Sequence, residues 1–131
     1  MGVRTFSTYV TADTTLVTVA ETVIATLSGV STNQPGQTVA LHGQATVASG
    51  GSTTGVTLRV RRDNLIGALV GEALPDTLQG AAGTTETHDI YTEDSGAGEF
   101  SGRAYVLTMQ QVAAAANGNV LTASLVADVT P

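Results

Sequence analysis

The sequence predicts an all-β protein, an antiparallel β-sandwich that is jelly-roll-like and has about eight strands. Short runs of Thr, Val and Ala alternate between apolar and polar positions, which is the period of a half-buried strand. Clusters of Gly, Asn, Ser and Pro interrupt these runs every 8 to 12 residues or so, as in sandwich folds. An immunoglobulin-like sandwich is the alternative, but the chain has neither the cysteines nor the tryptophan of a true immunoglobulin domain.

The first strand is predicted over residues 5–12. Residues 16–20 and 22–27 then form one long strand or two short ones. The apolar phase shifts by one residue near Glu21, which predicts a β-bulge there.

A turn cluster at residues 31–37 contains a Pro-Gly pair, which suits a type II turn. A long strand with one dry face follows over residues 38–48. The flexible stretch 49–55 leads into a strand at 56–62, and we expect these two strands to form a hairpin.

The segment "NLIGALVGEAL", residues 64–74, is ambiguous because Asn64 could cap a helix. Two interior glycines favour a loop followed by a strand at 68–73. Residues 85–94 alternate as a strand with an acidic face.

The strand pattern is clearest over residues 103–112, "RAYVLTMQQV". The Asn117-Gly118 pair that follows is a strong hairpin signal, and it precedes a last strand at 120–129.

The 131 residues fit one domain. We assign residues 14–131 to a single β-sandwich and residues 1–13 to an N-terminal arm or a first strand. The apolar residues are mostly small or β-branched, so each stabilises the core little, and further burial between identical subunits is expected.

Composition excludes several classes of partner and chemistry. A net charge of −6 disfavours nucleic acid, which requires a basic face. The absence of cysteine excludes disulfides and thiolate metal sites. No apolar run approaches the roughly 18 residues that span a bilayer, and no signal peptide is evident, so we predict no membrane partner and synthesis in the cytoplasm.

No catalytic, cofactor-binding or metal-binding residues are predicted. His42 and His88 are the only histidines, and both are expected on the wetter face of their strands, with Asp89 beside one. A two-histidine, one-carboxylate metal site needs a spacing that the sequence does not offer. Glu93 and Asp94 lack the spacing of a calcium loop, and a charged end that keeps an edge strand soluble is the simpler interpretation.

Motifs for other chemistries are missing from the sequence. There is no G-x-S-x-G elbow, phosphate-binding loop or dinucleotide fingerprint. The three tyrosines and two phenylalanines must also serve the core, which leaves little for stacking on sugars.

The stretch "GVTLRVRRDN", residues 55–64, holds three of the five arginines in a chain without lysine. Arg59 and Arg61 share one face of the predicted strand, opposite its valines and leucine, and Arg62 begins the turn. A subunit or partner interface is the favoured interpretation, ahead of a solvated face within the chain and an anion site. The acidic partners are expected on the strand over residues 85–94, so the predicted interface set is Arg59, Arg61, Arg62, Glu86, Asp89 and Glu93.

The succession "ETVIATLSGVST", "QTVALHGQATVASGGSTTGVTLRVRRD", "GALVGEA" and "RAYVLTMQQ" resembles small virion proteins of tailed bacteriophages. The resemblance covers residues 14–129 in general pattern, and it is to the β-sandwich decoration (cement) and head-fibre proteins that coat capsids. It implies a jelly-roll-like sandwich that forms a homotrimer on the virion surface, binds the major capsid protein and has no enzymatic activity. The N-terminal residues would then form an arm that reaches the shell or a neighbouring subunit.

The predicted function is therefore a virion structural protein, an oligomeric decoration protein that stabilises a bacteriophage capsid from outside. The main alternative is a receptor-binding or carbohydrate-binding β-sandwich module of a phage fibre or surface protein.

Overall fold

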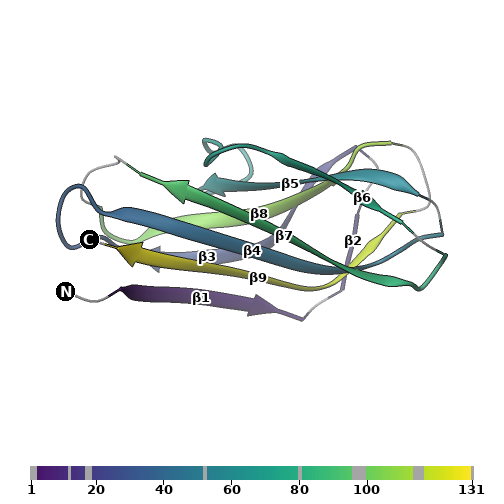
Figure 1. The fold of residues 1–131 in the computed structure, drawn as a ribbon, viewed down its shortest axis with the longest axis horizontal. Coiled ribbons are helices and arrows are strands. Elements are labelled where there is room, and N and C mark those ends of the chain that lie inside the picture. The colour runs from purple at the N-terminus through teal and green to yellow at the C-terminus, as the bar shows by residue number, and fades with distance from the viewer. Residues whose placement is uncertain are drawn as a thin grey trace.

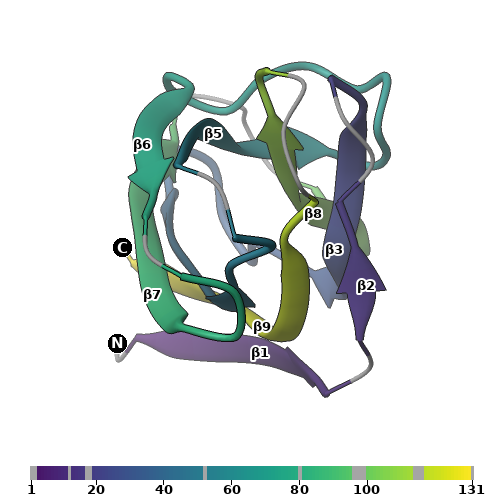
Figure 2. The same cartoon turned by 90° about the vertical axis from the view of Figure 1, so that its right-hand side faces the viewer.

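The computed structural model describes residues 3–11, 13–16, 19–51, 53–79, 81–95, 100–113 and 117–130. These residues form strands that stack as two sheets (Figures 1 and 2). The strands are β1 (Arg4–Val10), β2 (Thr14–Thr15), β3 (Glu21–Val30), β4 (Thr38–Ala48), β5 (Thr54–Arg62), β6 (Leu74–Leu78), β7 (Thr85–Asp94), β8 (Arg103–Gln111) and β9 (Asn119–Thr130).

The strand order is that of a jelly roll. The first sheet runs β1-β9-β4-β7, with the short β2 also paired to β9, and the second sheet runs β3-β8-β5-β6. Four antiparallel pairs, β1·β9, β3·β8, β4·β7 and β5·β6, are successive steps of one long ribbon. The pairings β4·β9 and β5·β8 roll that ribbon into two facing sheets. The predicted antiparallel, jelly-roll-like β-sandwich is thus confirmed.

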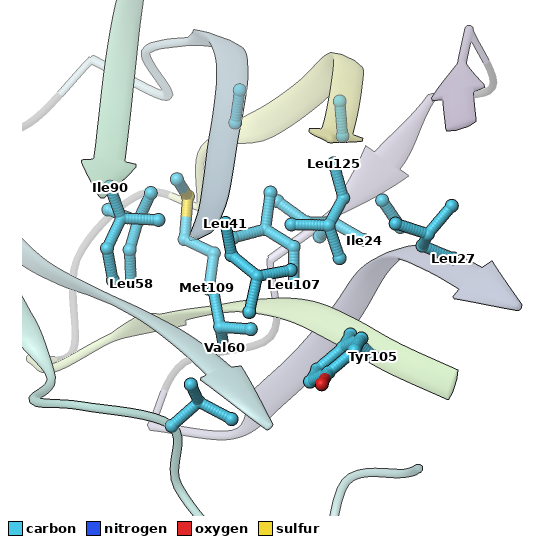
Figure 3. Close-up of a cluster of buried hydrophobic side chains, with 14 of the residues drawn as sticks. Ile24, Leu27, Leu41, Leu58, Val60, Ile90, Tyr105, Leu107, Met109 and Leu125 are labelled. Carbon is cyan, nitrogen blue, oxygen red and sulfur yellow. The ribbon is translucent and has the colours of Figure 1, made fainter. Parts of the chain in front are cut away.

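The core lies between the inward faces of the two sheets. Leu41 and Leu125 of the first sheet face Leu58, Leu107 and other residues of the second (Figure 3). Gly43 lets the sheets approach closely, because a Cβ there would lie 2.7 Å from Cδ1 of Leu107. The small core residues that composition predicted are therefore compensated by close packing.

Several predicted elements have the expected bounds. β4 and β7 begin and end where the alternation predicts, β8 ends one residue earlier than predicted, and β9 is one residue longer than predicted at each end. Gly36 has a φ of 81°, as a type II turn requires. Residues 4–10 of the proposed arm or first strand pair with β9.

Two local predictions are wrong. β3 starts at Glu21, and its register shifts lie between Val23 and Ala25 and between Leu27 and Val30, so the bulge is not at Glu21. The strand predicted at 68–73 is instead a loop with one bridge, from Leu69 to Arg61, and β6 follows it. Gly71 has a φ of 68° in that loop, a conformation that interrupts a strand.

Both predicted hairpins are also wrong. β4 and β5 belong to different sheets, and so do β8 and β9. The turn signals correctly mark where strands end, but each connection crosses from one sheet to the other. The same turn residues occur in hairpins and in connections between two sheets, so the turn sequence alone cannot distinguish them.

In the part of the chain that the structure describes, we find no helix with the length and apolar character to cross a membrane.

Candidate functional site

The arginines of β5 are distributed to two faces of the second sheet. Val56, Leu58 and Val60 point into the core, so Arg59 and Arg61 point outward, as predicted. By the same alternation, Arg62 lies on the inward face of β5, in line with Leu58 and Val60. It stands at the end of the strand, where its side chain reaches past the core toward the first sheet.

We call the outward group the Glu21 cluster. Arg61 binds Glu21 through two atoms, with Nε 2.6 Å from Oε2 and Nη2 2.9 Å from Oε1. Arg59 donates to Gln110 at 2.7 Å and lies 3.4 Å from Glu21, while Thr108 donates to Glu21 at 2.7 Å. Hydrogen bonding from Arg61 lowers the pKa of Glu21, so the carboxylate stays ionised. The cluster covers the outer face of β8, where Thr108 is fully buried.

We call the inward group the Asp94 cluster. Asp94, a buried residue at the end of β7, accepts hydrogen bonds from both Nε and Nη2 of Arg62. It also accepts from Arg103 at 3.1 Å and from the hydroxyl of Tyr105 at 2.7 Å. The Arg103 guanidinium lies 3.8 Å from the ring centroid of Phe100. The cluster therefore ties the first sheet to β5 and β8 of the second.

Two pKa shifts follow from the Asp94 cluster. Burial alone would raise the pKa of Asp94, but the hydrogen bonds from Arg62 and Tyr105 outweigh it and lower that pKa below its ordinary value. Burial, together with the hydrogen bond to Asp94, raises the pKa of the Tyr105 hydroxyl. Tyr105 therefore stays protonated and donates throughout the physiological range.

Among the residues that the structure describes, the carboxylates that Arg59, Arg61 and Arg62 contact are Glu21 and Asp94, not the expected Glu86, Asp89 and Glu93. Those three residues lie on β7 in the other sheet, where Asp89 and Glu93 face outward. The interface role predicted for them stays a prediction.

His42 lies on the outer face of the first sheet, as predicted. Its Nε2 donates to Asp89 at 2.8 Å, and Gln44 donates to the same oxygen at 3.0 Å. Its ring stacks on Tyr91 with centroids 4.2 Å apart and planes 5° from parallel. The outer face thus holds a paired ring platform.

His88 was predicted on the wetter face, but it is buried between the sheets. Its Nδ1 donates to Asp76 of β6 at 2.8 Å, which lowers the pKa of Asp76. Its buried Nε2 has no hydrogen-bond partner among the described residues and lies 3.9 Å from Glu86. Because His42 and His88 lie on opposite faces of the first sheet, they do not form a metal site together. No metal-binding group of three or more ligands occurs among the described residues.

A groove of about 500 Å³ opens on the outer face of the first sheet, near the end at which β7 finishes. Ala40 forms its low point, because the strand register places Glu93 on one side of this small side chain and Asp128 on the other. The next row places His42 between Tyr91 and Val126. The groove is lined by Ala40, Leu41, His42, Tyr91, Thr92, Glu93, Val126 and Asp128.

Two tyrosines lie outside the core and are exposed to solvent. Tyr91 is 74% exposed and Tyr9 is 66% exposed, both on the outer face of the first sheet. The expectation that the aromatic residues would be consumed by the core is wrong for these two. Sequence reasoning also missed the groove, because the groove depends on which strands are neighbours.

Comparison with known proteins gives a likeness of fold. No protein-family model matches the chain, and no curated protein matches it. Among solved structures, the chain is similar to one in the structure of infectious bursal disease virus, Gx strain, with a TM-score of 0.51 and 8% sequence identity. The match covers 98% of this chain but only 32% of the viral one. The chain therefore spans about a third of the length of that protein, and the shared property is the all-β fold.

Proposed function

We propose that this chain is a non-enzymatic structural protein of a virus particle, specifically an oligomeric decoration protein that binds the outer surface of a bacteriophage capsid and stabilises it. The observation that carries the proposal is the jelly-roll strand order of the two sheets. That topology is used widely in viral capsid domains, and the similar chain comes from a virus particle. The motif resemblance to phage decoration proteins adds the finer assignment.

The outer face of the first sheet supports a role in adhesion. Register places Thr46 beside Thr87 and Thr122, and Gln44 beside Ser124. The threonine and serine side chains are short and uncharged, so ordering them against a partner loses little entropy and requires little desolvation. We infer that such a face binds another protein through many modest hydrogen bonds.

The chemistry of the two acidic groups that bind the arginines of β5 agrees with a structural role. Glu21 and Asp94 are each ionised and each held by arginine and hydroxyl donors of the same chain. Their hydrogen-bonding capacity is spent on joining strands.

Light scattering and particle rebinding test the proposal together. The purified protein is expected to be a homo-oligomer, in particular a trimer, and to bind particles from which it has been stripped, raising the temperature at which they break. A protein that is monomeric at micromolar concentration and does not bind stripped particles would refute this function.

A carbohydrate-binding or receptor-binding module is the second candidate, and the exposed Tyr91–His42 stack favours it. A sugar ring could pack on Tyr91 while Glu93 and Asp128 accept hydrogen bonds from its hydroxyls. Glycan-array binding that is lost in Tyr91→Ala but kept in Tyr9→Ala would establish this candidate. Binding that is absent or equal in both variants would reject it.

A further inference from the structure

The loop between β5 and β6 carries an apolar tip. Ile66 is 92% exposed, and its neighbour Leu65 is 40% exposed. Leu69, in the same loop, is also 40% exposed. Solvent-exposed aliphatic residues that gather on one loop, in a chain with few large apolar residues, mark an interaction site more often than chance placement does.

The tip is held in a fixed shape by its own short-range bonds. The side-chain oxygen of Asn64 accepts a hydrogen bond from the Ile66 amide at 3.0 Å, and the backbone carbonyl of Asn64 accepts one from the Gly67 amide at 2.9 Å. Gly67 has no alternative here, because a Cβ would lie 1.7 Å from the Arg62 carbonyl oxygen.

The base of the loop is bound to the body of the sandwich. The amide of Asp63 donates to Ala104 of β8 at 2.8 Å, and Arg62 donates through its amide to Ala68 at 3.0 Å. The Arg61 side chain also donates to the Gly67 carbonyl at 3.1 Å. A contact made by such a pre-formed tip loses little conformational entropy on binding.

The groove of the first sheet has the shape and lining for this tip. Ala40 and Val126 give it an apolar floor, and the exposed ring of Tyr91 gives it an apolar wall. Its volume of about 500 Å³ exceeds that of two aliphatic side chains.

Charged groups border both surfaces. Glu93 and Asp128 form the acidic rim of the groove. Arg62, at the base of the loop, keeps about a third of its side chain exposed while it binds Asp94. Arg62 is thus already paired, and the exposed Asp63 follows it in the loop, so apolar burial and not attraction between charges would drive the contact.

The tip and the groove belong to one end of the molecule but to different sides of it. Thr92 of β7 donates to the Val70 carbonyl at 3.1 Å, so the loop's return segment lies along β7, whereas the groove opens on the outer face between β7 and β9. Two different patches on one subunit make a head-to-tail contact, which a rotation can close into a ring.

We propose that Leu65 and Ile66 of one copy dock in the groove of the next copy, so that this contact, repeated around an axis, builds the homo-oligomer. The proposal deepens the proposed function and rests on it for the oligomeric state. It names the segment that inserts and the surface that receives it.

Sedimentation equilibrium of Ile66→Asp tests the inserting side. We expect association to weaken about thirty-fold or more, the size found for a central interface anchor. Val19→Asp is the matched control, because Val19 is 61% exposed and its φ of 57° tolerates aspartate. Its amide donates to the Gln111 carbonyl at the end of β8, whereas the loop tip lies near Ala104 at the start of that strand. Equal association of wild type and both variants would overturn the docking, as would equal weakening by both.

Cysteine pairing tests the receiving side, because the chain has no cysteine of its own. On oxidation, Ile66→Cys combined with Val126→Cys is expected to give covalent species beyond the dimer, ending at the ring. Each single variant can give at most a dimer. The pair Val19→Cys with Val126→Cys is the control, and equal cross-linking by the two pairs would overturn the contact.

The outcomes separate this contact from the proposed function. If the wild type associates and binds particles while Ile66→Asp changes neither, the docking is wrong and the function stands. If the ring forms through this contact but does not bind particles, the function is wrong and the docking stands. A monomer that loses particle binding on Ile66→Asp would assign the tip to the shell, which overturns the contact between copies.

Discussion

The Asp94 cluster takes Arg62, and the Glu21 cluster takes Arg59 and Arg61, from the same short stretch of β5, yet the two clusters have different roles. The Asp94 cluster is buried at one end of the sandwich and connects the two sheets through Arg62, Arg103 and Tyr105. The Glu21 cluster lies on the outer face and connects neighbouring strands of one sheet. Strand alternation decides this difference, because Arg62 is one residue out of phase with Arg61.

The comparison shows how location sets the value of an ion pair. A carboxylate inside the protein must be matched by its donors, since removing it leaves cations and a hydroxyl with no partner. A carboxylate on the surface is partly replaced by water when it is removed. The Asp94 cluster should therefore contribute more to stability, although both clusters contain two arginines.

Asp94→Ala is expected to have the largest effect, lowering the free energy of unfolding by about 3 kcal/mol. The substitution removes the carboxylate that pairs with Arg62 and Arg103, and it leaves the buried Tyr105 hydroxyl without an acceptor. Urea unfolding measures the loss. Glu93→Ala, which changes the adjacent exposed carboxylate, is the control and should stay within about 0.5 kcal/mol of wild type. A loss no greater than that of the control would contradict the assigned role of the cluster.

Acid should remove part of the same stabilisation. The folded pKa of Asp94 lies below its ordinary value of 3.8, so on acidification the unfolded chain takes up its proton first. The contribution is present above pH 3.8 and is lost as the pH falls through the folded pKa. Unfolding measured from pH 6 to pH 2 should show a steeper decline in wild type than in Asp94→Ala, and equal slopes would count against the shift.

Tyr105→Phe isolates one bond of the Asp94 cluster. The ring is fully buried and remains, while the hydroxyl that donates to Asp94 at 2.7 Å is removed. We expect a loss of about 1.5 kcal/mol by urea unfolding, the usual value for a hydrogen bond to a charged group. Combining this change with Asp94→Ala should add little further loss, since both remove the same bond, and full additivity would show that the two residues act independently.

Glu21→Gln is expected to have the smallest effect, about 1 kcal/mol. The amide keeps the shape of the side chain and loses its charge toward Arg59 and Arg61. Because the cluster is on the surface, this difference should shrink in about 1 M salt, where charges are screened within about 3 Å. An effect that equals that of Asp94→Ala and resists salt would erase the distinction between the clusters.

Periodicity was sufficient to predict what depends on neighbours along the chain. It placed β4 and β7 at their observed bounds and put Arg59 and Arg61 on one outward face. It could not predict their partner, because Glu21 lies on β3 and reaches them only across β8.

The sequence also did not predict which face of a strand points into the core when both faces are polar, as in β7. Both of its faces carry polar residues, so the pattern did not reveal that His88 and Asp94 point inward with Ile90 while Tyr91 points outward. The exposed ring of Tyr91 and the buried His88 both follow from that undetermined phase, whereas the groove also depends on which strands are neighbours. The loop tip at Ile66 was likewise hidden, because its apolar letters resemble those of a strand.

The order of strands in the two sheets has a consequence during synthesis. β8 and β9, the last two strands along the chain, occupy interior positions: β9 separates β1 from β4, and β8 separates β3 from β5. Before residues 103–130 are made, β4 can pair with β7 and β5 with β6, but β1 and β3 have no partner strand, and β4 and β5 each keep one edge open to other nascent chains. The two sheets can therefore close only after β8 and β9 have been made. Chains that lack β8 and β9 would be the species most prone to aggregate.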